Sequence, residues 1–298
     1  MTLYDAFLEF VIDRKSQALT FKTLEFYENT LRVFIKYLGR ETDISTITHR
    51  KIKDYAIELQ SRNLSKATVA SYLRSVKVFL RWVHGEYSLS FDPARIRVPK
   101  SPKKKVHIYS DREIYQIFDL IRASVPWITA RNRAMVALML DSGIRQSEVC
   151  GLLREFVDTS SGLMKVYGKG DKERYVPVGT FALRFLDDYL AQCPYQSEYV
   201  FLSIDGRPIT ANTVRQFTYK LQKKLPFEFS SHRLRHNFAT NYCLDSLAER
   251  KTTGVYDLSI IMGHTSIETT KRYEHLAHEL IAANSCISHL DKVYAEKR

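Results

Sequence analysis

The stretch SSHRLRHNFAT, residues 230–240, determines what the second half of this chain is predicted to be. Ser230 or Ser231 is a suitable helix N-cap, because a serine side chain can accept a hydrogen bond from the first turn. Leu234 and Phe238 are four residues apart and therefore lie on one face of a helix. The stretch predicts a helix that buries this apolar face.

A polar pair lies on the neighbouring face of the same predicted helix. His232 and Arg235 are three residues apart, so their side chains are neighbours on the helix surface. An imidazole beside a guanidinium forms a set of donors suited to phosphate oxygens. The alternative for this stretch alone is a solvated polar face, since Arg233 and His236 are also close.

Other segments carry further candidates, each with a plain structural alternative. In DSGIRQSEV (141–149), Arg145 follows a predicted helix end at Gly143, and its alternative role is a helix cap paired with Glu148. In GLMKVYGKGDKERYVPV (162–178), Lys169 lies at the tip of a predicted β-hairpin, where a solvated turn lysine is the alternative.

The segment IIMGHTSIETTKRYEH (260–275) contains a histidine and a tyrosine nine residues apart. His264 follows a helix end, and Thr265 with Glu268 forms a T-x-x-E capping pattern for a short next helix. Tyr273 is predicted at the end of that helix. Taken alone, His264 would be a structural residue at a helix junction and Tyr273 a packing aromatic.

Taken in order, these segments resemble the tyrosine recombinase (phage integrase) family, in its simple two-domain Xer/Cre-like type. The matching motifs are SGIRQSE, GKGDKER, HRLRHNFAT, MGH and a tyrosine nine residues after the last histidine. The resemblance implies a mainly α fold, with an N-terminal helical bundle (a SAM-like core-binding domain) and a mixed α+β catalytic domain with a small antiparallel sheet. The implied catalytic residues are Arg145, Lys169, His232, Arg235, His264 and Tyr273.

The chemistry of these residue types agrees with the roles that the resemblance implies. A phenol has an ordinary pKa near 10, so Tyr273 needs help to attack a phosphodiester. Arg145 and Arg235 would stabilise the charge that builds on the phosphate, while His232 and His264 would donate hydrogen bonds or help to move the tyrosine's proton. Lys169 would protonate the departing 5′ oxygen. No cofactor or metal is implied, because the sequence has neither a P-loop nor a carboxylate cluster suited to Mg²⁺.

The charge distribution favours a polyanionic partner. The net charge is +12, and residues 1–105, with 20 Lys+Arg and 11 Asp+Glu, carry +9 of it. Residues 106–298 contain 25 Lys+Arg and 22 Asp+Glu, a net charge of +3. A basic module joined to a nearly balanced one suggests nucleic acid, although a basic surface kept for solubility is the alternative. Candidate DNA-contacting residues are Arg74, Lys77, Arg81, Lys103, Lys104 and Lys105.

Hydrophobic periodicity predicts the domain organisation. Apolar residues recur at helical spacing in residues 3–15, 23–38, 49–62 and 66–87, which predicts a helical core DNA-binding domain over 1–90. Residues 91–107, with three prolines and a basic run, are predicted as an extended linker, the alternative being a surface loop within one domain. The catalytic domain with a C-terminal helical tail is predicted over 108–298.

Two details of the predicted catalytic domain go beyond the family motifs. Residues 197–203 are expected to add a third strand to the hairpin. The separation of His232 from His264 exceeds that expected for compact relatives, and the extra length is expected in a loop over 247–258.

The predicted function is site-specific DNA recombination through a 3′-phosphotyrosine, without membrane association. Four separated cysteines and the lack of a signal peptide or membrane segment favour the cytoplasm. Expected partners are double-stranded DNA and further copies of the chain, as a homo-tetramer on two sites, with an accessory protein possible. Integration and excision of a mobile element is the leading role and Xer-like dimer resolution the alternative. A type IB topoisomerase or a non-catalytic DNA-binding relative ranks lower.

Overall fold

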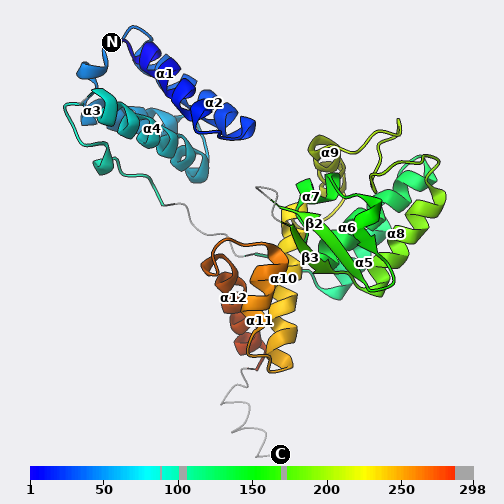
Figure 1. Cartoon of the computed structure of the whole chain (residues 1–298). Helices are drawn as coiled ribbons and strands as arrows, with labels where there is room; N and C mark the ends of the chain where they lie inside the picture. Colours follow the sequence, from blue (N-terminus) through cyan, green and yellow to red (C-terminus); the bar gives the residue numbers. More distant parts are fainter. Residues whose placement is uncertain (88, 101–105, 169–172, 286–298) are drawn as a thin grey trace, which may run out of the picture. The chain divides into compact units, whose positions relative to one another are not determined.

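The computed structural model describes residues 1–87, 89–100, 106–168 and 173–285 (Figure 1). Contacts within the chain divide it into two compact units, Met1–Lys104 and Lys105–Arg298. The fold is mainly helical with one small antiparallel sheet, which confirms the predicted fold class.

The first unit is a helical bundle around one apolar core. Its elements are α1 (Leu3–Ser16), α2 (Phe21–Leu38), η1 (Ile44–Thr46), α3 (His49–Ser61), α4 (Lys66–Tyr87) and η2 (Pro93–Arg95). Phe10, Phe34, Tyr55 and Phe79 are fully buried where the apolar helix faces meet. Burial of these rings and of the other apolar side chains of the core drives the packing of short helices that would be marginal alone.

The chain after α4 stays packed against the first unit. Ile96 is buried in its core, and the Lys77 ammonium donates to the backbone carbonyls of Ala94 at 2.7 Å and Ile96 at 2.8 Å. The segment predicted as an extended linker therefore contains the turn η2 and a buried side chain. An apolar residue beside prolines gains more from joining the core than from remaining in water. Lys103, Lys104 and Lys105 lie outside the described residues.

The second unit combines helices with the sheet. Its helical elements are α5 (Asp111–Leu120), α6 (Pro126–Ser142), α7 (Gln146–Cys150), η3 (Arg154–Phe156), α8 (Thr180–Gln192), α9 (Ala211–Gln222), α10 (Ser231–Ala248), α11 (Gly254–Met262) and α12 (Glu268–Ser285). Its strands are β1 (Val157–Asp158), β2 (Leu163–Tyr167) and β3 (Glu173–Pro177). Figure 1 shows the strands close to α6 and α8.

The sheet is antiparallel with the strand order β1-β2-β3. Met164 pairs with Val176 across β2 and β3, and both are fully buried against the helices because alternate residues of a strand face opposite sides. The expected third strand at residues 197–203 is wrong. That segment forms isolated bridges, whereas β1 pairs with β2 through a tight turn at Gly162, which has a φ of 65°.

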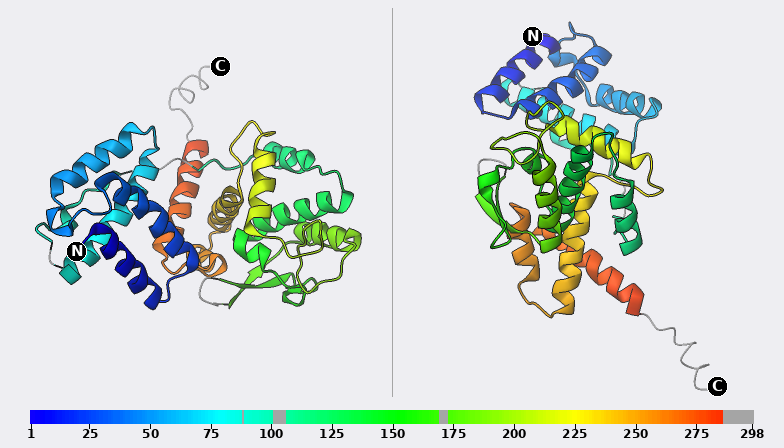
Figure 2. Two further views of the ribbon diagram at one scale, coloured as in Figure 1. Left: turned by 90° about the horizontal axis from the view of Figure 1, so that it is seen from above. Right: turned by 90° about the vertical axis from the view of Figure 1, so that its right-hand side faces the viewer.

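Helix α10 connects two cores of the second unit. It packs against α6 on one side and against α11 and α12 on the other, as the views in Figure 2 show. Gly143 ends α6 in the left-handed conformation (φ 63°), and a Cβ there would strike the ring of Phe238. Glycine therefore lets α10 approach the end of α6 closely.

Two predictions about the end of the described chain are wrong. Helix α12 begins at Glu268 and continues to Ser285, so Tyr273 lies in its second turn and not at the end of a short helix. The expected T-x-x-E box would have required a start two residues earlier. Much of the expected loop over 247–258 is helical, because α10 extends to Ala248 and α11 begins at Gly254.

Candidate active site

Arg235 is the most deeply embedded of the candidate cations. It is 5% exposed, and its two terminal nitrogens donate to the carbonyl of Gly143 and, at 2.6 Å, to that of Met262. These carbonyls lie at the C-terminal ends of α6 and α11, where the helix dipole favours a positive charge. Burial and the neighbouring Arg145 lower the pKa of Arg235 to about 10, so the guanidinium stays charged at neutral pH.

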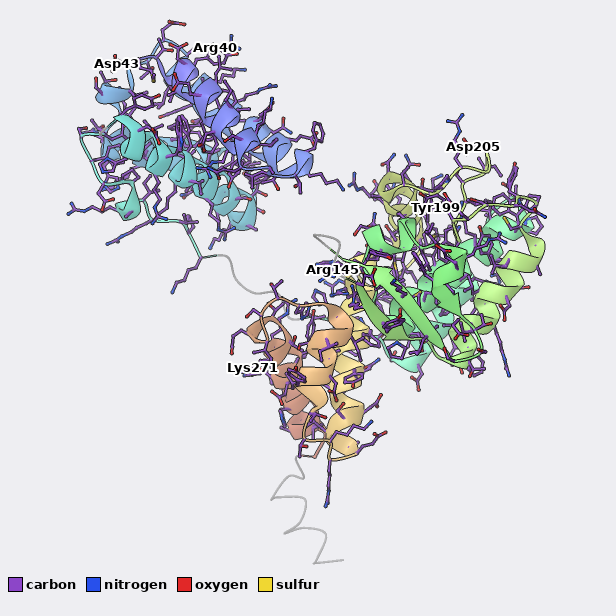
Figure 3. The ribbon with its side chains drawn as sticks, viewed as in Figure 1. Arg40, Asp43, Arg145, Tyr199, Asp205 and Lys271 are labelled. Carbon is purple, nitrogen blue, oxygen red and sulfur yellow. The ribbon has the colours of Figure 1, made fainter. Side chains whose placement is uncertain are left out.

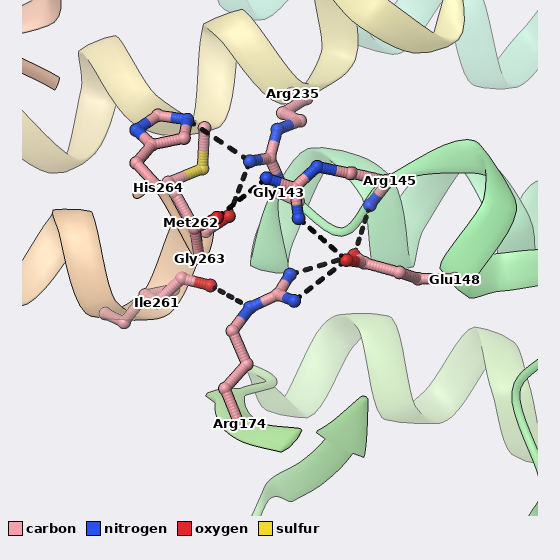
Figure 4. A network of polar contacts seen from close by, with 9 residues as sticks. All are labelled: Gly143, Arg145, Glu148, Arg174, Arg235, Ile261, Met262, Gly263 and His264. Atoms are coloured by element: carbon pink, nitrogen blue, oxygen red, sulfur yellow. Dashed lines mark hydrogen bonds and ion pairs between the residues drawn. The ribbon is translucent and has the colours of Figure 1, made fainter. Parts of the chain in front are cut away.

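Glu148 holds two further arginines in place (Figure 4). Arg174, from β3, makes a bidentate pair with its carboxylate, with both nitrogen–oxygen distances at 2.8 Å. Arg145 donates to the same carboxylate at 2.9 Å and, through its other terminal nitrogen, to the carbonyl of Gly263 at 2.9 Å. The two arginines lower the pKa of the Glu148 carboxyl despite its burial, so it is ionised at neutral pH.

We call Arg145, Arg174, Arg235 and Glu148 the arginine cluster. Three guanidiniums and one carboxylate leave these four side chains with two excess positive charges. The side chain of Arg145 is 34% exposed, whereas that of Arg174 is 8% exposed. Figure 3 shows Arg145 where the sheet half of the second unit meets α10. The cluster is therefore suited to bind an anion through Arg145, with the buried arginines fixing its position and strengthening its field.

His264 joins the arginine cluster to α12. Its Nε2 lies 3.3 Å from a terminal nitrogen of Arg235, and its Nδ1 lies 2.8 Å from the Thr270 hydroxyl. Because a guanidinium can only donate, the His264 Nε2 is the acceptor and Nδ1 carries the hydrogen. Burial, and then the positive charge of Arg235, lower the pKa of His264 to about 4, so its ring is neutral at pH 7.

His232 lies at the surface end of α10. It is exposed, and its ring centroid is 5.2 Å from that of His236, one helical turn further along. Partial desolvation and the nearby charges of Arg235, Arg272 and Arg145 lower the pKa of His232. A neutral, accessible imidazole at this position can donate or accept a hydrogen bond from a bound molecule.

Tyr273 is buried among these residues and its phenol has two side-chain partners. The Tyr273 Oη lies 2.7 Å from the Nδ1 of His236 and 2.9 Å from a terminal nitrogen of Arg272. The Arg272 guanidinium lies 4.8 Å from the centre of the phenol ring, and the His264 ring is stacked at 6.3 Å. We call Tyr273, His236 and Arg272 the tyrosine cluster. Tyr273 is 2% exposed while Arg272 is at the surface, so moving this arginine would uncover the phenol.

The structure places most of the predicted catalytic residues in one connected set of contacts. Arg235 contacts His264, Arg145 contacts the residue before His264, and the ring of His264 stacks on Tyr273. His232 is joined to this group through the ring of His236. Lys169 lies outside the described residues, between β2 and β3.

Sequence reasoning assigned no role to three residues that contact the site. Arg174 is the last residue of the quoted GKGDKER motif, and His236 follows His232 by four residues, so both had a signal in the sequence. Arg272, the neighbour of Tyr273 in the sequence, is exposed and also donates to the phenol. Lys271 is exposed and pairs with Glu268 at 2.6 Å (Figure 3).

The candidate DNA-contacting residues of α4 differ in their surroundings. Arg74 and Arg81 are exposed and, seven residues apart, lie on the same face of the helix. Lys77 lies between them and is half-buried, with its ammonium on the two carbonyls described above. Arg74 and Arg81 are therefore freer than Lys77 to contact a ligand.

No helix in the described part of the chain is long and apolar enough to cross a membrane. The same residues contain no group of three or more His, Cys, Asp and Glu side chains placed to hold a metal ion.

Two family models match the chain. Residues 110–279 match the phage integrase family, and residues 5–86 match the phage integrase N-terminal SAM-like domain. The two matches cover the second and first units of the structure, respectively.

Proteins with similar sequences are tyrosine recombinases. The chain is 30% identical over 272 residues to tyrosine recombinase XerC of Halalkalibacterium halodurans, covering 86% of this chain and 88% of that protein. It is 29% identical over 256 residues to XerC of Lacticaseibacillus casei, covering 82% and 84%. It is 28% identical over 291 residues to tyrosine recombinase XerD of Listeria innocua, covering 92% and 94%.

Solved structures of integrases share the fold. A lambda integrase dimer bound to a COC′ core site superposes with a TM-score of 0.75 at 19% identity, covering 92% of this chain and 95% of that one. The Tn1549 transposon integrase in complex with a circular intermediate DNA gives a TM-score of 0.74 at 18% identity, covering 100% and 98%.

Proposed function

The chain belongs to the phage integrase family of tyrosine recombinases, enzymes that break and rejoin DNA strands, and we propose that it acts at specific sites through a covalent bond from Tyr273 to a 3′ phosphate. One observation carries this assignment: a buried phenol is stacked on His264, which contacts a cluster with excess positive charge. A nucleophile and an anion site are thus adjacent within one chain. Covalent attachment conserves the energy of the phosphodiester, so rejoining needs no ATP.

The proposed roles follow from exposure and charge. Arg145, the most exposed member of the arginine cluster, exchanges its hydrogen bond to the Gly263 carbonyl for a phosphate oxygen. Arg235 supplies a fixed positive charge behind it, and His232 and His264 complete the set of polar groups around the phosphate. Such preorganised charge acts on the transition state without a cost of reorganisation. Lys169 remains the proposed acid for the 5′ oxygen.

Double-stranded DNA at recombination sites is the proposed partner. The support is the net charge of +9 on residues 1–105 and the similarity of the fold to integrases solved with DNA. The exposed Arg74 and Arg81, with Lys77, Lys103, Lys104 and Lys105, are the proposed phosphate contacts. Assembly as a homo-tetramer on two sites, with or without an accessory protein, is part of the same proposal. Binding that depends on such contacts weakens steeply with salt.

Two biological roles use this chemistry and each has some support. Integration and excision of a mobile element is the role that the sequence reasoning placed first. The similarity to XerC and XerD over most of the chain supports the alternative, resolution of chromosome or plasmid dimers. The position of the target site in the host genome separates the two, since a mobile element carries its site at its own end.

Covalent capture tests the function and finds the target sequence in the same experiment. The purified chain is mixed with sheared genomic DNA of its source organism, and DNA bound to denatured protein is recovered and sequenced. The expected result is enrichment of one sequence that is absent with Tyr273→Phe, because removal of the hydroxyl removes the nucleophile. A nicked duplex of that sequence should then trap the wild-type adduct, while Tyr273→Phe still binds it.

The outcomes discriminate between the candidate functions. Adducts spread over arbitrary sequences would favour a type IB topoisomerase. Specific binding without a covalent adduct would favour a non-catalytic DNA-binding protein. An undiminished adduct with Tyr273→Phe would show that another residue is the nucleophile.

A further inference from the structure

The hydrogen-bond pattern around Tyr273 fixes where its proton points. The phenol oxygen has two side-chain partners, Arg272 and His236, and carries one hydrogen. A guanidinium can only donate, so the hydroxyl accepts from Arg272. Its hydrogen is therefore directed to the Nδ1 of His236 at 2.7 Å. Nδ1 is then the unprotonated nitrogen of this ring, and Nε2 carries the hydrogen.

His236 is held at this position by two helices. It lies on α10 next to Arg235 and one turn after His232, and it faces Tyr273 on α12 with ring centroids 5.5 Å apart. His236 is half-buried, and the packing of α10 on α12 places its ring beside the phenol. The histidine that touches the nucleophile is thus a residue to which the sequence reasoning assigned no role.

From this geometry we propose that His236 is a catalytic residue that accepts the proton of Tyr273 during cleavage. The proposal rests on the proposed function, in which Tyr273 attacks DNA. The Oη–P bond forms as the P–O5′ bond breaks, and the proton passes from Oη to the Nδ1 of His236. The 5′ oxygen takes a proton from a separate acid, for which Lys169 is the candidate. In rejoining, the steps reverse and the His236 imidazolium returns its proton to the tyrosine oxygen.

The electrostatic surroundings support this role. Burial, together with the positive or titratable groups His232, Arg272, Arg233 and Arg235, lowers the pKa of His236 to about 4. Its Nδ1 lone pair is therefore available at neutral pH. A weak base suffices because the phenol oxygen becomes far more acidic as it bonds to phosphorus. Arg272, which donates to the same oxygen, offsets the negative charge that develops there.

Two variants separate proton acceptance from simple positioning. His236→Asn places an amide oxygen on Cγ, where Nδ1 is attached, so it keeps a hydrogen-bond acceptor that takes up no proton at neutral pH. His236→Ala removes the acceptor. His275→Asn, on an exposed part of α12, is the matched control. Single-turnover cleavage is measured on the duplex recovered by covalent capture, with DNA binding and thermal unfolding followed in parallel.

Both His236 variants should cleave about 100-fold more slowly than the wild type, the usual contribution of a general base. His275→Asn should cleave normally. Replacing the bridging 5′ oxygen with sulfur provides a leaving group that needs no acid. It should relieve the defect of Lys169→Ala but not that of either His236 variant, because their defect lies on the nucleophile side.

Several results would overturn the proposal. Wild-type cleavage by His236→Asn would show a positioning role alone, and faster cleavage by either variant would show that the contact only restrains the resting tyrosine. Relief by the 5′ sulfur would place His236 on the leaving-group side. These outcomes differ from failure of the proposed function, in which the wild-type protein itself forms no adduct that depends on Tyr273.

The contact itself can be tested without DNA. Nitrogen-15 NMR of labelled histidines should show His236 as the Nε2–H tautomer, with an Nδ1 resonance that shifts in Tyr273→Phe. An Nδ1–H tautomer, or no shift in that variant, would contradict the geometry on which the proposal depends.

Discussion

The arginine cluster and the tyrosine cluster lie side by side but are held in different ways. The arginine cluster joins α7, β3 and α10 to the end of α11 through one carboxylate and several backbone carbonyls. The phenol ring of the tyrosine cluster is buried and stacks on His264, and its oxygen has one hydrogen-bond partner on another helix, His236 of α10. Its second partner, Arg272, is the exposed residue next to it in the sequence.

This difference indicates which part moves. Groups that several elements fix at once keep their geometry, and this favours electrostatic stabilisation of a transition state. The phenol, in contrast, is covered by the exposed side chain of Arg272, which can shift at low cost. Because Tyr273 is 2% exposed, its hydroxyl has to be uncovered before it can attack. We infer that the phosphate-binding part is assembled in advance and that Arg272 shifts on DNA binding to uncover the phenol, which keeps its contact with His236.

The largest predicted effects compare two arginines within the arginine cluster. Arg145→Ala should slow single-turnover cleavage by about 1,000-fold, or ~4 kcal/mol, because a preorganised donor to the phosphate is lost. Its stability should change little, since Glu148 keeps its bidentate pair with Arg174. Arg235→Ala should lose as much activity and also about 3 kcal/mol of unfolding free energy, because two charge-assisted bonds to carbonyls disappear.

Cleavage kinetics and denaturant unfolding measured on the same two variants test this comparison. Equal losses of stability would mean that Arg145 is as structural as Arg235, and the distinction between an exposed contact and a buried support would fail. Retention of activity by Arg145→Ala would remove it from the phosphate site.

The second prediction tests the excess charge of the arginine cluster. Glu148→Gln should cost about 3 kcal/mol of unfolding free energy, because three guanidiniums lose their only negative partner within the cluster. Sulfate should stabilise this variant more than the wild type, since an anion can replace the lost charge. Thermal unfolding with and without sulfate measures both effects.

Glu58→Gln is the matched control for this substitution. Glu58 pairs with Arg62 on the exposed surface of α3, where an ion pair contributes at most about 0.5 kcal/mol. If the two variants lost equal stability, or if sulfate stabilised both alike, the cluster would not be an anion site.

The sequence predicted the tyrosine's identity better than its surroundings. Gly143, the hairpin and the helices of the first unit were predicted because turn residues and apolar periodicity are local signals. β1 was missed because a two-residue strand exists only through its pairing with β2. The start of α12 was misplaced because the Thr265 pattern suits a cap that the chain does not use.

At the site, too, the sequence did not reveal which side chains contact the phenol. The motif order selected Tyr273, His264 and Arg235, and the structure places them in contact. That His236 and not His232 touches the phenol depends on how α12 packs on α10, which no spacing within one helix specifies. Arg174 reaches Glu148 across the fold for the same reason.

The smallest predicted effect is the pH dependence of stability that comes from His264, beside the arginine cluster, and His236, in the tyrosine cluster. Burial lowers the pKa of both His264 and His236 to about 4, from an ordinary value of 6.5. Between pH 6.5 and 4 the unfolded chain therefore binds more protons than the folded chain. The stabilising contribution of the two neutral rings to the unfolding free energy is complete above pH 6.5 and is lost as the pH falls towards 4. Because both rings are half-buried, solvent screening reduces that contribution to on the order of 1 kcal/mol for each ring.

Unfolding free energy measured from pH 7 to 4.5 checks this prediction, since the stability that the ionised Glu148 carboxyl contributes, with its lowered pKa, is lost mainly below that range. His264→Asn and His236→Asn should each flatten the pH dependence, whereas substitution of the exposed His278 should not. If DNA binding uncovers the tyrosine cluster but leaves the arginine cluster intact, bound DNA should reduce the effect of His236→Asn more than that of His264→Asn. Equal reductions would mean that both clusters rearrange together, and the distinction between a fixed and a moving part would be wrong.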